Sequence, residues 1–174
     1  MKKQELKAIS FQPIGVIRTP YKGDHAPYQA PERDEGEARL VLEPEYEPGL
    51  KELDRFGYIY VFYYMDRARK DVSPKSPGDM IAHPPWAGGK GVGLFASRSP
   101  DRPNPIGLSI VKLRKIKGNV VVTSLLDAFD GTPLLDIKPY LAELDAKDDA
   151  NYGWLDEKGR DHLMLHIRGV PHDH

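Results

Sequence analysis

The 174-residue sequence contains no cysteine, which excludes a disulfide framework and any metal site built on thiolates. No apolar run approaches the roughly 20 residues that a membrane-spanning helix needs, so we expect no membrane partner. The first residues, Met1 to Glu5, lack the apolar core of an export signal. The formal net charge of −1 excludes a strongly basic nucleic-acid-binding protein. These absences predict a cytoplasmic protein.

What the sequence does contain is a series of short alternating or β-branched stretches. They predict strands over 9–17, 37–42, 58–65, 93–96, 107–116, 120–126 and 134–140. A short helix is expected over 48–56, ended by Gly57, and a tight hairpin turn at 117–119. Long Pro/Gly-rich loops follow the first and third of these strands. This pattern indicates an antiparallel barrel or sandwich.

The most unusual segment is residues 95–109, which hold two arginines, three prolines and an asparagine between two apolar runs. Because proline fixes φ and removes an amide donor, this segment cannot be ordinary helix or central strand. We expect a rigid loop in which Arg98 and Arg102 present planar donors to a carboxylate or phosphate. Asn104 would then bind a neighbouring polar group. The alternative is a loop held by its own salt bridges.

A second candidate site lies between Asp127 and Tyr140. On a strand, Asp136, Lys138 and Tyr140 share one face, and Leu135 and Ile137 share the other. The pattern is compatible with a structural ion pair, or with a site whose carboxylates bind a cation or a ribose diol.

Two weaker signals concern an aromatic loop and a basic cluster. Tyr28 and Gln29 are suited to stacking on and hydrogen bonding to a flat heterocycle, although an inert surface loop explains them equally well. Lys112 and Arg114 belong to a cluster of cations that either contacts RNA or forms the solvated rim of a sheet.

Several common sites are excluded or disfavoured. Residues 88–93 are glycine-rich, but Lys90 precedes Gly91 and the following residues are typical of a strand, so the phosphate-binding loop lacks its context. No Ser-His-Asp arrangement is evident. The histidines near the C-terminus, His162, His166, His172 and His174, do not predict a metal site. The strand pattern there places His162 and His166 outward.

Taken in order, these segments resemble the TsaA-like family. The matching pieces are Ile14–Lys22, Pro27–Gln29, Gly93–Ser99, Arg102–Ser109, Asp130–Pro133 and Asp136–Tyr140. Their common order over residues 14–140 is far more specific than any single motif. Asp66-Arg67 stand where bacterial members tend to have a His-Gln pair. A short tail from residue 141 replaces the bacterial C-terminal domain, so the chain resembles the shorter archaeal form.

The resemblance implies both a fold and an activity. The fold is all-β: a single antiparallel β-barrel with one or two short helices and long Pro/Gly-rich loops. Residues 1–144 would form the barrel domain, and 145–174 a C-terminal extension that packs on the barrel or on a partner subunit. The activity is S-adenosylmethionine-dependent methyl transfer to the exocyclic nitrogen of a threonylcarbamoyl-modified adenosine beside the tRNA anticodon. The enzyme would be a homodimer with its cofactor near the subunit interface.

The resemblance also suggests roles for individual residues. Asp136 would accept the proton of the acceptor nitrogen, positioned by Lys138 or Tyr140, with Asn104 as a further catalytic candidate. The candidate cofactor-binding residues are Pro27, Tyr28, Gln29, Asp66, Arg67, Arg98, Leu108, Asp127, Asp130, Gly131 and Thr132. The candidate substrate-binding residues are Arg102, Lys112 and Arg114.

Within the cofactor set, the chemistry of the donor suggests a division of labour. Arg98 would hold the cofactor carboxylate, Asp127 and Asp130 suit its ribose diol or its cation, and Leu108 and Tyr28 would flank its adenine. Two other functions stay open. One is a non-catalytic β-barrel that binds a small anionic ligand or RNA, and the other is methylation of a different base or small molecule.

Overall fold

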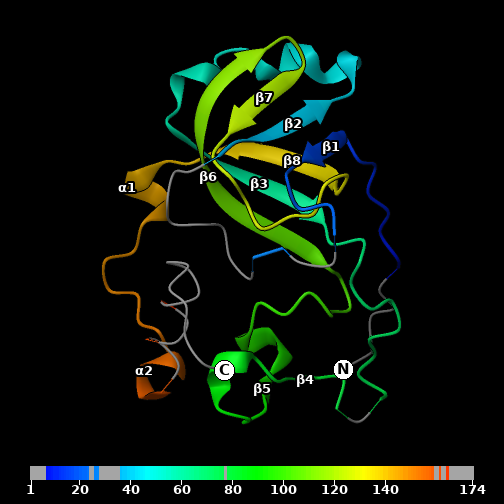
Figure 1. Ribbon diagram of the computed structural model, residues 1–174, viewed down its shortest axis with the longest axis vertical. Helices are drawn as coiled ribbons and strands as arrows, with labels where there is room; N and C mark the ends of the chain where they lie inside the picture. The colour runs from blue at the N-terminus through cyan, green and yellow to red at the C-terminus, as the bar shows by residue number, and fades with distance from the viewer. Residues whose placement is uncertain are drawn as a thin grey trace.

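Six antiparallel strands form the main body of the protein (Figure 1). The computed structural model describes residues 7–23, 26–27, 36–76, 78–158, 161 and 164. The strands pair in the order β1-β2-β7-β6-β3-β8, and β8 pairs again with β1, so the sheet closes into a barrel. This confirms the prediction of a mostly β chain with short helices. The strands are β1 Gly15–Arg18, β2 Ala38–Leu42, β3 Tyr58–Tyr64, β6 Ile106–Lys117, β7 Val120–Thr123 and β8 Pro133–Pro139.

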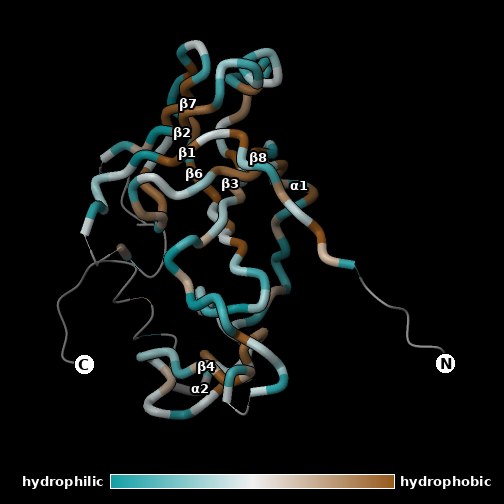
Figure 2. The backbone as a smooth tube through the Cα atoms, turned by 90° about the vertical axis from the view of Figure 1, so that its right-hand side faces the viewer, coloured by the Kyte–Doolittle hydropathy of each residue, from teal (hydrophilic) through white to brown (hydrophobic). Residues whose placement is uncertain are grey.

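The inward side chains of these strands make up the hydrophobic core. Successive residues of a strand point to opposite faces, and in β6 every second residue from Gly107 to Leu113 is buried. Hydrophobic residues are concentrated along the barrel strands (Figure 2). Burying such a side chain contributes about 1.5–3 kcal/mol. The core residues with no exposed surface are Ile17, Ala38, Leu40, Ile59, Val61, Val121, Leu126 and Leu134.

The chain between β3 and β6 forms an irregular lobe below the barrel in Figure 1. It contains the two-stranded sheet of β4 (Ile81–Ala82) and β5 (Val92–Gly93), and the 3₁₀ turns η3 (Pro85–Ala87) and η4 (Leu94–Ala96). Charged groups tie the lobe together. The Arg69 side chain pairs with Asp71 at 2.9 Å and with Asp79. The Arg69 backbone N–H donates to Asp101 Oδ1 at 2.9 Å.

After the barrel the chain returns to this lobe. It passes through two short helices, α1 (Ala142–Asp145) and α2 (Leu155–Lys158). The indole N–H of Trp154 donates to the Ala96 carbonyl at 2.8 Å. The tail is therefore fastened to the lobe at Trp154. The division of the chain at residue 144 stays a prediction.

The predicted helix over 48–56 is wrong. The segment instead forms two 3₁₀ turns, η1 (Pro44–Leu50) and η2 (Leu53–Arg55). Pro48 lies inside the first turn, where it cannot donate a helical hydrogen bond. Glu52 separates the turns with a left-handed φ of 67°. The apolar face nevertheless packs as expected, since Leu50 is buried and Leu53 contacts the core.

Several strand boundaries also differ from the prediction. β1 begins only at Gly15, because residues 7–13 are exposed and unpaired in the sheet. The predicted strand over 93–96 is mostly the 3₁₀ turn η4. The tight turn between β6 and β7 is confirmed, and Gly118 there takes a φ of 55°. No helix in the described part of the chain is long and apolar enough to cross a membrane.

A bulge in β8 changes the predicted alternation of that strand. Its register against β3 shifts between Phe62 and Tyr63, which face Asp136 and Leu134 respectively. Leu135 is the extra residue, and Leu134, with no exposed surface, takes the position beside Ile137 that the alternation had predicted for Leu135. Asp136 and Lys138 still share one face, while Ile137 packs against the core.

Candidate functional site

Three polar side chains are hydrogen bonded to one another at the end of the barrel that faces the lobe. Ser109 Oγ donates to Asp127 Oδ1 at 2.5 Å, and the Tyr63 hydroxyl donates to the same oxygen at 3.1 Å. The two hydroxyl oxygens lie 3.2 Å apart. Tyr63 and Ser109 are only 4% and 5% exposed. A carboxylate held by two buried hydroxyl groups is an unusual and costly feature of a small barrel.

The fold explains why these groups meet. Tyr63 is an inward residue near the end of β3, and Ser109 is an inward residue near the start of β6. Asp127 lies in the segment after β7, between Leu126 and Ala128, which are both buried. The two buried neighbours anchor this segment, so the Asp127 carboxylate is fixed between the strands.

The electrostatics of this cluster centre on Asp127. Burial raises the pKa of Asp127 above its usual range, and the hydrogen bonds from Ser109 and Tyr63 and the charge of Arg98 offset this only in part. Burial, and then the Asp127 charge, raise the pKa of Tyr63 and of Tyr21. Arg98, Tyr21 and Tyr63 therefore all lie within electrostatic range of Asp127. The structure thus brings together Arg98 and Asp127, two of the predicted cofactor-binding residues.

The proline-rich loop that carries Arg98 is stiffened by Arg102. Arg102 Nη1 donates to the carbonyl oxygens of Ser97 and Ser99, at 3.0 and 3.2 Å. These carbonyls flank Arg98 on either side. The Arg102 guanidinium also lies 5.8 Å from the centre of the Phe95 ring. The loop is therefore held by hydrogen bonds from one of its own arginines to backbone carbonyls, where the alternative interpretation predicted salt bridges.

Asp130, Gly131 and Thr132 form a turn that packs against the end of β1. Asp130 accepts a hydrogen bond from the Thr19 N–H at 3.2 Å and pairs with Arg18 at 3.6 Å. The Gly131 N–H donates to the Ile17 carbonyl at 2.8 Å, and Gly131 has a φ of 87° that favours glycine. Thr132 is buried. These contacts tie Asp130 to the turn and to β1, whereas Asp127 contacts the hydroxyl groups of Tyr63 and Ser109.

Arg67 connects two loops near this turn. Its Nη1 donates to the Gly23 carbonyl at 2.7 Å, and its guanidinium carbon lies 4.1 Å from the centre of the Phe129 ring. Asp66, beside it, is exposed. Arg67 therefore fastens the chain after β1 to the segment that carries Asp127.

A second group of predicted residues lies on the outside of the barrel. Leu108 on β6 and Asp136 on β8 both pair with Phe62 of β3, so the three residues form one row across the outer face. Lys138 Nζ lies 3.0 Å from Asp136 Oδ2, and the two side chains are 61% and 48% exposed. Exposed ion pairs contribute about 0–1 kcal/mol, so stability alone gives little reason for this one.

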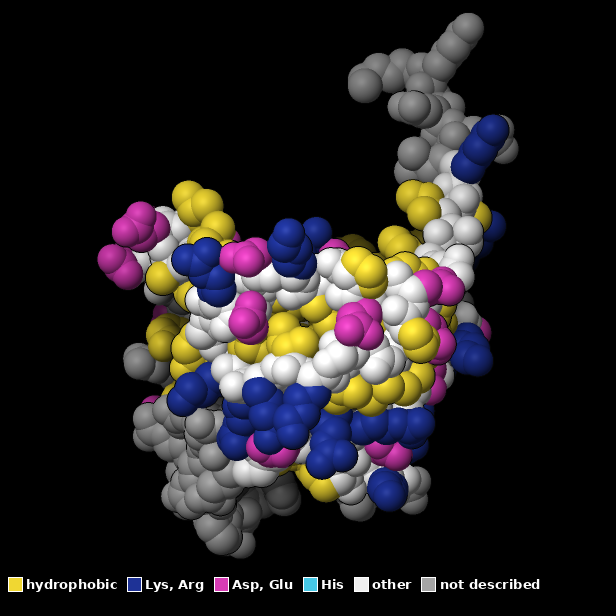
Figure 3. Space-filling model, turned by 90° about the horizontal axis from the view of Figure 1, so that it is seen from above, with side chains coloured by type: hydrophobic (Ala, Val, Ile, Leu, Met, Phe, Trp, Pro, Cys, Tyr) yellow, Lys and Arg dark blue, Asp and Glu magenta, His cyan; other side chains and the backbone are white. Residues whose placement is uncertain are grey.

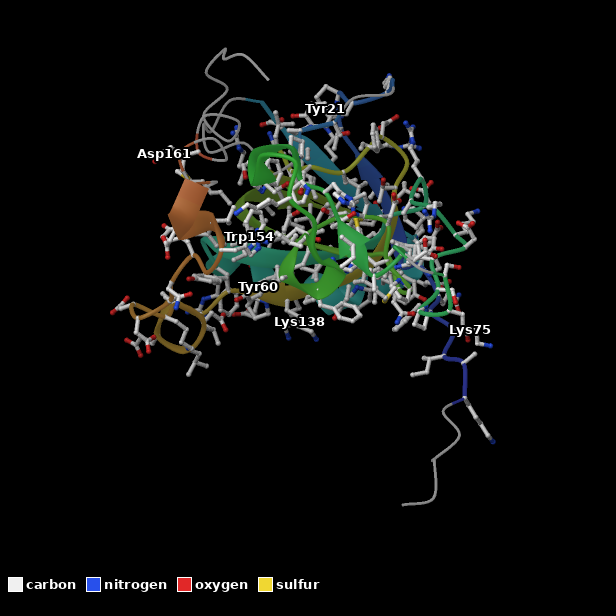
Figure 4. The ribbon with its side chains drawn as sticks, turned by 90° about the horizontal axis from the view of Figure 1, so that it is seen from below. Tyr21, Tyr60, Lys75, Lys138, Trp154 and Asp161 are labelled. Carbon is white, nitrogen blue, oxygen red and sulfur yellow. The ribbon has the colours of Figure 1, made fainter. Side chains whose placement is uncertain are left out.

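Aromatic rings surround this ion pair. Tyr140 packs against Tyr60 with ring centres 5.5 Å apart, and against Tyr58 at 6.4 Å. Tyr60 lies opposite Lys138 in the sheet. Figure 4 shows both residues at one edge of the molecule, with Tyr21 at the opposite edge. The outer group is thus separated from the Asp127 cluster by the sheet itself.

The remaining predicted residues are dispersed. Asn104 is exposed beside the start of β6, where its carbonyl accepts from the Ile106 N–H at 2.8 Å. Lys112 is exposed on β6, and Arg114 lies 3.6 Å from Glu37. Seen from the end of the barrel away from the lobe, Lys and Arg side chains gather in a band along one side of the face (Figure 3).

Some predictions fall outside the described residues. Pro27 is partly buried, but Tyr28 and Gln29 are not among the residues that the structure describes. The same holds for His162, His166, His172 and His174. Within the described part of the chain, no group of three or more His, Asp or Glu residues is arranged to hold a metal ion.

The sequence analysis missed Tyr63 and Ser109. A signal was present in the alternation of the strands, because each of the two is a hydroxyl residue at a position whose inward neighbours on the same strand are apolar. Buried polar groups are nearly always hydrogen bonded, so each of them required a partner. The identity of that partner could not be obtained from periodicity.

Comparisons with known proteins bear on this site. A family model for the tRNA-methyltransferase O N-terminal domain matches residues 16–146. A probable S-adenosyl-L-methionine-binding protein of Pyrococcus abyssi is 39% identical over 160 residues, which cover 88% of this chain and 83% of that protein. The tRNA (adenine(37)-N6)-methyltransferase of Escherichia coli is 32% identical over 154 residues, covering 84% of this chain and 63% of the enzyme.

A solved structure agrees with the sequence relatives. A crystal structure of TrmO matches with a TM-score of 0.68 and 30% identity, covering 86% of this chain and 63% of that one. The chain carries a tRNA-methyltransferase O N-terminal domain. It belongs to the TsaA/TrmO-like family, as the resemblance indicated. It spans less than two thirds of the Escherichia coli enzyme and of the solved TrmO chain.

Proposed function

We propose that this protein is an S-adenosylmethionine-dependent methyltransferase that acts on tRNA. The acceptor would be the exocyclic nitrogen of a threonylcarbamoyl-modified adenosine next to the anticodon, and the reaction would take place in the cytoplasm. Family membership supports the class of reaction, and relatives from Escherichia coli and Homo sapiens carry the name tRNA (adenine(37)-N6)-methyltransferase. The observation that carries the proposal is that Asp127 accepts hydrogen bonds from two buried hydroxyl groups and lies within electrostatic range of the loop arginine Arg98.

The residues at the barrel end fit the chemistry of this cofactor. S-adenosylmethionine has a carboxylate, cationic groups, a ribose diol and an adenine. Arg98 offers a guanidinium to an anion, and Asp127 offers a carboxylate to a cation or hydroxyl donor. Arg67 lies over the ring of Phe129, 4.1 Å from its centre, in the segment that also carries Asp127. When bound, the cofactor supplies an activated methyl group.

The protein's contribution to the reaction is mainly positional. Holding reactants in a productive orientation can supply about 7–11 kcal/mol in favourable cases. The acceptor nitrogen is amide-like, so a carboxylate that accepts its proton would assist transfer. Asp136 is the proposed proton acceptor, and Lys138, 3.0 Å away, holds its carboxylate in place. Tyr140 and Asn104 are proposed to help orient the acceptor.

We further propose that the protein acts as a homodimer that uses the outer face of β3, β6 and β8. On β6, Ile106, Leu108 and Ile110 all point outward and are 39%, 52% and 48% exposed. Contiguous exposed apolar surface of this kind usually marks an interface. The proposed proton acceptor Asp136 and the proposed cofactor residue Leu108 lie on this face, whereas Asp127 lies at the barrel end. A second copy on this face would place catalytic groups at the subunit boundary.

The substrate's phosphates require a basic surface. Lys112 and Arg114 on β6 are the proposed contacts. The band of Lys and Arg side chains at the end of the barrel away from the lobe (Figure 3) offers a basic surface on which phosphates could bind. Arg102 was assigned to the same set from the sequence. Its bonds to the Ser97 and Ser99 carbonyls support a different task, that of fixing the loop around Arg98.

The decisive experiment combines calorimetry with methyl transfer. The purified protein is expected to bind S-adenosylmethionine, and to transfer a labelled methyl group to tRNA that carries the threonylcarbamoyl modification. Absence of binding at millimolar cofactor would exclude the methyltransferase function. Retention of tRNA binding without methyl incorporation would select the non-catalytic alternative. Incorporation into another base or small molecule only would select the divergent enzyme.

A further inference from the structure

Two aspartates in the same loop are used in different ways. Asp130 is partly exposed, accepts from the Thr19 N–H and pairs with Arg18. Asp127 is flanked by buried residues and accepts from two buried hydroxyl groups, Tyr63 and Ser109. The structure therefore accounts for Asp130 as part of a turn. Asp127 serves as the acceptor for two buried hydroxyl groups, but a neutral amide oxygen could fill that role, so the structure alone does not require a charged carboxylate there.

Keeping an ionised carboxylate in a buried position costs free energy. Hydroxyl donors reduce this cost without neutralising the charge. Both hydroxyls are directed to one carboxylate oxygen, Oδ1, which fixes the orientation of the group as a whole. Such an arrangement is expected where a cationic ligand group is to be bound, because a preorganised carboxylate need not reorient on binding.

Resting on the proposed function, we propose that Asp127 binds the α-ammonium group of the methyl donor while Arg98 binds its α-carboxylate. Tyr63 and Ser109 are the residues that position Asp127. The two charges of an amino acid are separated by a single carbon atom. A carboxylate and a guanidinium within electrostatic range of each other form a complementary pair for such a zwitterion.

The other positive or polar parts of the donor fit Asp127 less well. A sulfonium has no hydrogen to donate, so a carboxylate oxygen can meet it only through its charge. A ribose diol is neutral, and exposed carboxylates or amides would serve it without the cost of burying an ion. An ammonium combines a full charge with three donors, and so offsets the burial of Asp127 most completely.

A panel of three ligands distinguishes these possibilities. S-adenosylmethionine has the ammonium and the sulfonium, S-adenosylhomocysteine has only the ammonium, and methylthioadenosine has neither but keeps the ribose. Asp127→Asn is expected to weaken binding of the first two by a similar factor of about tenfold or more, and to leave the third unchanged. Loss confined to S-adenosylmethionine would assign Asp127 to the sulfonium and overturn the inference. Equal loss for methylthioadenosine would assign it to the ribose, with the same consequence.

The roles of Tyr63 and Ser109 are tested separately. Ser109→Ala and Tyr63→Phe remove the hydroxyl groups that bind Asp127, and both are expected to weaken the same two ligands. Ser109→Thr keeps the hydroxyl and is expected to restore affinity. Ser124→Ala is the matched control, because the Ser124 hydroxyl accepts from the Lys112 N–H, on the sheet rather than in the cluster. Folded hydroxyl variants with unchanged affinity would contradict the positioning role.

The outcome for the wild-type protein keeps the two proposals apart. If the wild type binds none of the three ligands, the proposed function fails. If it binds them and Asp127→Asn binds S-adenosylmethionine and S-adenosylhomocysteine as tightly as the wild type, only the assignment of Asp127 fails. Should Tyr63→Phe or Ser109→Ala not fold, the Asp127→Asn panel still decides the central assignment.

Discussion

The ring of Tyr63 lies directly across β6 at Gly107, so closely that a Cβ atom there would be 2.1 Å from Tyr63 Cε2 and 2.3 Å from Cζ. The two residues are paired in the register of β3 and β6. Only glycine lets the ring pass over the strand and carry its hydroxyl to Asp127. Gly107, which lies in the 95–109 segment, is therefore required for the Tyr63 hydroxyl to reach the Asp127 carboxylate.

Gly107→Ala should consequently destabilise the protein. The neighbour is a ring packed in the core, so it cannot move aside without disturbing its own contacts. Overpacking of this kind costs about 1–3 kcal/mol, measurable as a lower midpoint of urea unfolding. Gly93→Ala is the control, because Gly93 has a φ of −55° and a Cβ added there would meet no atom within 4 Å. Similar small effects at both glycines would show that the Tyr63 ring is free to move.

Replacement of Asp127 should separate stability from binding. Burial raises the pKa of Asp127 in the folded state, so the folded protein holds this proton more tightly than the unfolded chain does. Its contribution to stability then falls as pH rises through the raised pKa. Asp127→Asn removes the charge, and is expected to match or exceed the wild type in free energy of unfolding at pH 7. A loss of more than about 1 kcal/mol would mean that the ionised carboxylate stabilises the fold.

Cofactor binding should show the opposite dependence on pH. The charged and titratable groups around Asp127 are Arg98, Tyr21 and Tyr63. The pKa values of the two tyrosines are raised from a value that is already alkaline, so both are neutral throughout the acid range. Affinity should therefore fall as pH drops through the raised pKa of Asp127. Ser109→Ala removes a hydrogen bond that lowers this pKa, so the fall should occur at higher pH. Calorimetry across a pH series tests this, with a flat profile expected for Asp127→Asn.

Arg102 and Lys112 should affect different ligands. Arg102→Ala removes the bonds to the carbonyls on either side of Arg98, and is expected to weaken cofactor binding about tenfold. Lys112→Ala should leave the cofactor affinity intact and lower the salt dependence of tRNA binding by about one phosphate contact. Titrations at several salt concentrations distinguish the two. If Arg102→Ala lowers the salt dependence of tRNA binding and leaves cofactor affinity normal, Arg102 contacts RNA, as the sequence analysis predicted.

The outer face of the barrel should control assembly. Ile110→Lys places a charge on an exposed position that the proposed dimer buries, and should convert the dimer to a monomer without unfolding it. Light scattering after gel filtration measures this directly. Ile81→Lys is the matched control, since Ile81 is similarly exposed at 45% but lies in β4, away from this face. A wild-type protein that is monomeric at all concentrations would remove the proposed interface.

Much of the fold could be predicted from local sequence. Strands such as β2 and β3 have alternating or β-branched residues, and the turn at Gly118 has the chemistry of a tight hairpin. The helix over 48–56 failed because its apolar spacing suits a 3₁₀ turn as well as an α-helix. The bulge at Leu135 could not be foreseen, since it depends on pairing with β3.

The sequence by itself determined the alternation that builds the barrel strands, the stiffness of the loop around Arg98 and the ordered motifs that mark the family. Only the tertiary structure decided that Tyr63 and Ser109 donate to Asp127 while Asp130 holds a turn against Arg18 and Thr19, and that Arg102 binds its own loop. The reason is physical. Tyr63 and Asp127 are 64 residues apart in the chain, and burial and hydrogen-bond partners at such separations are set by how the strands pair.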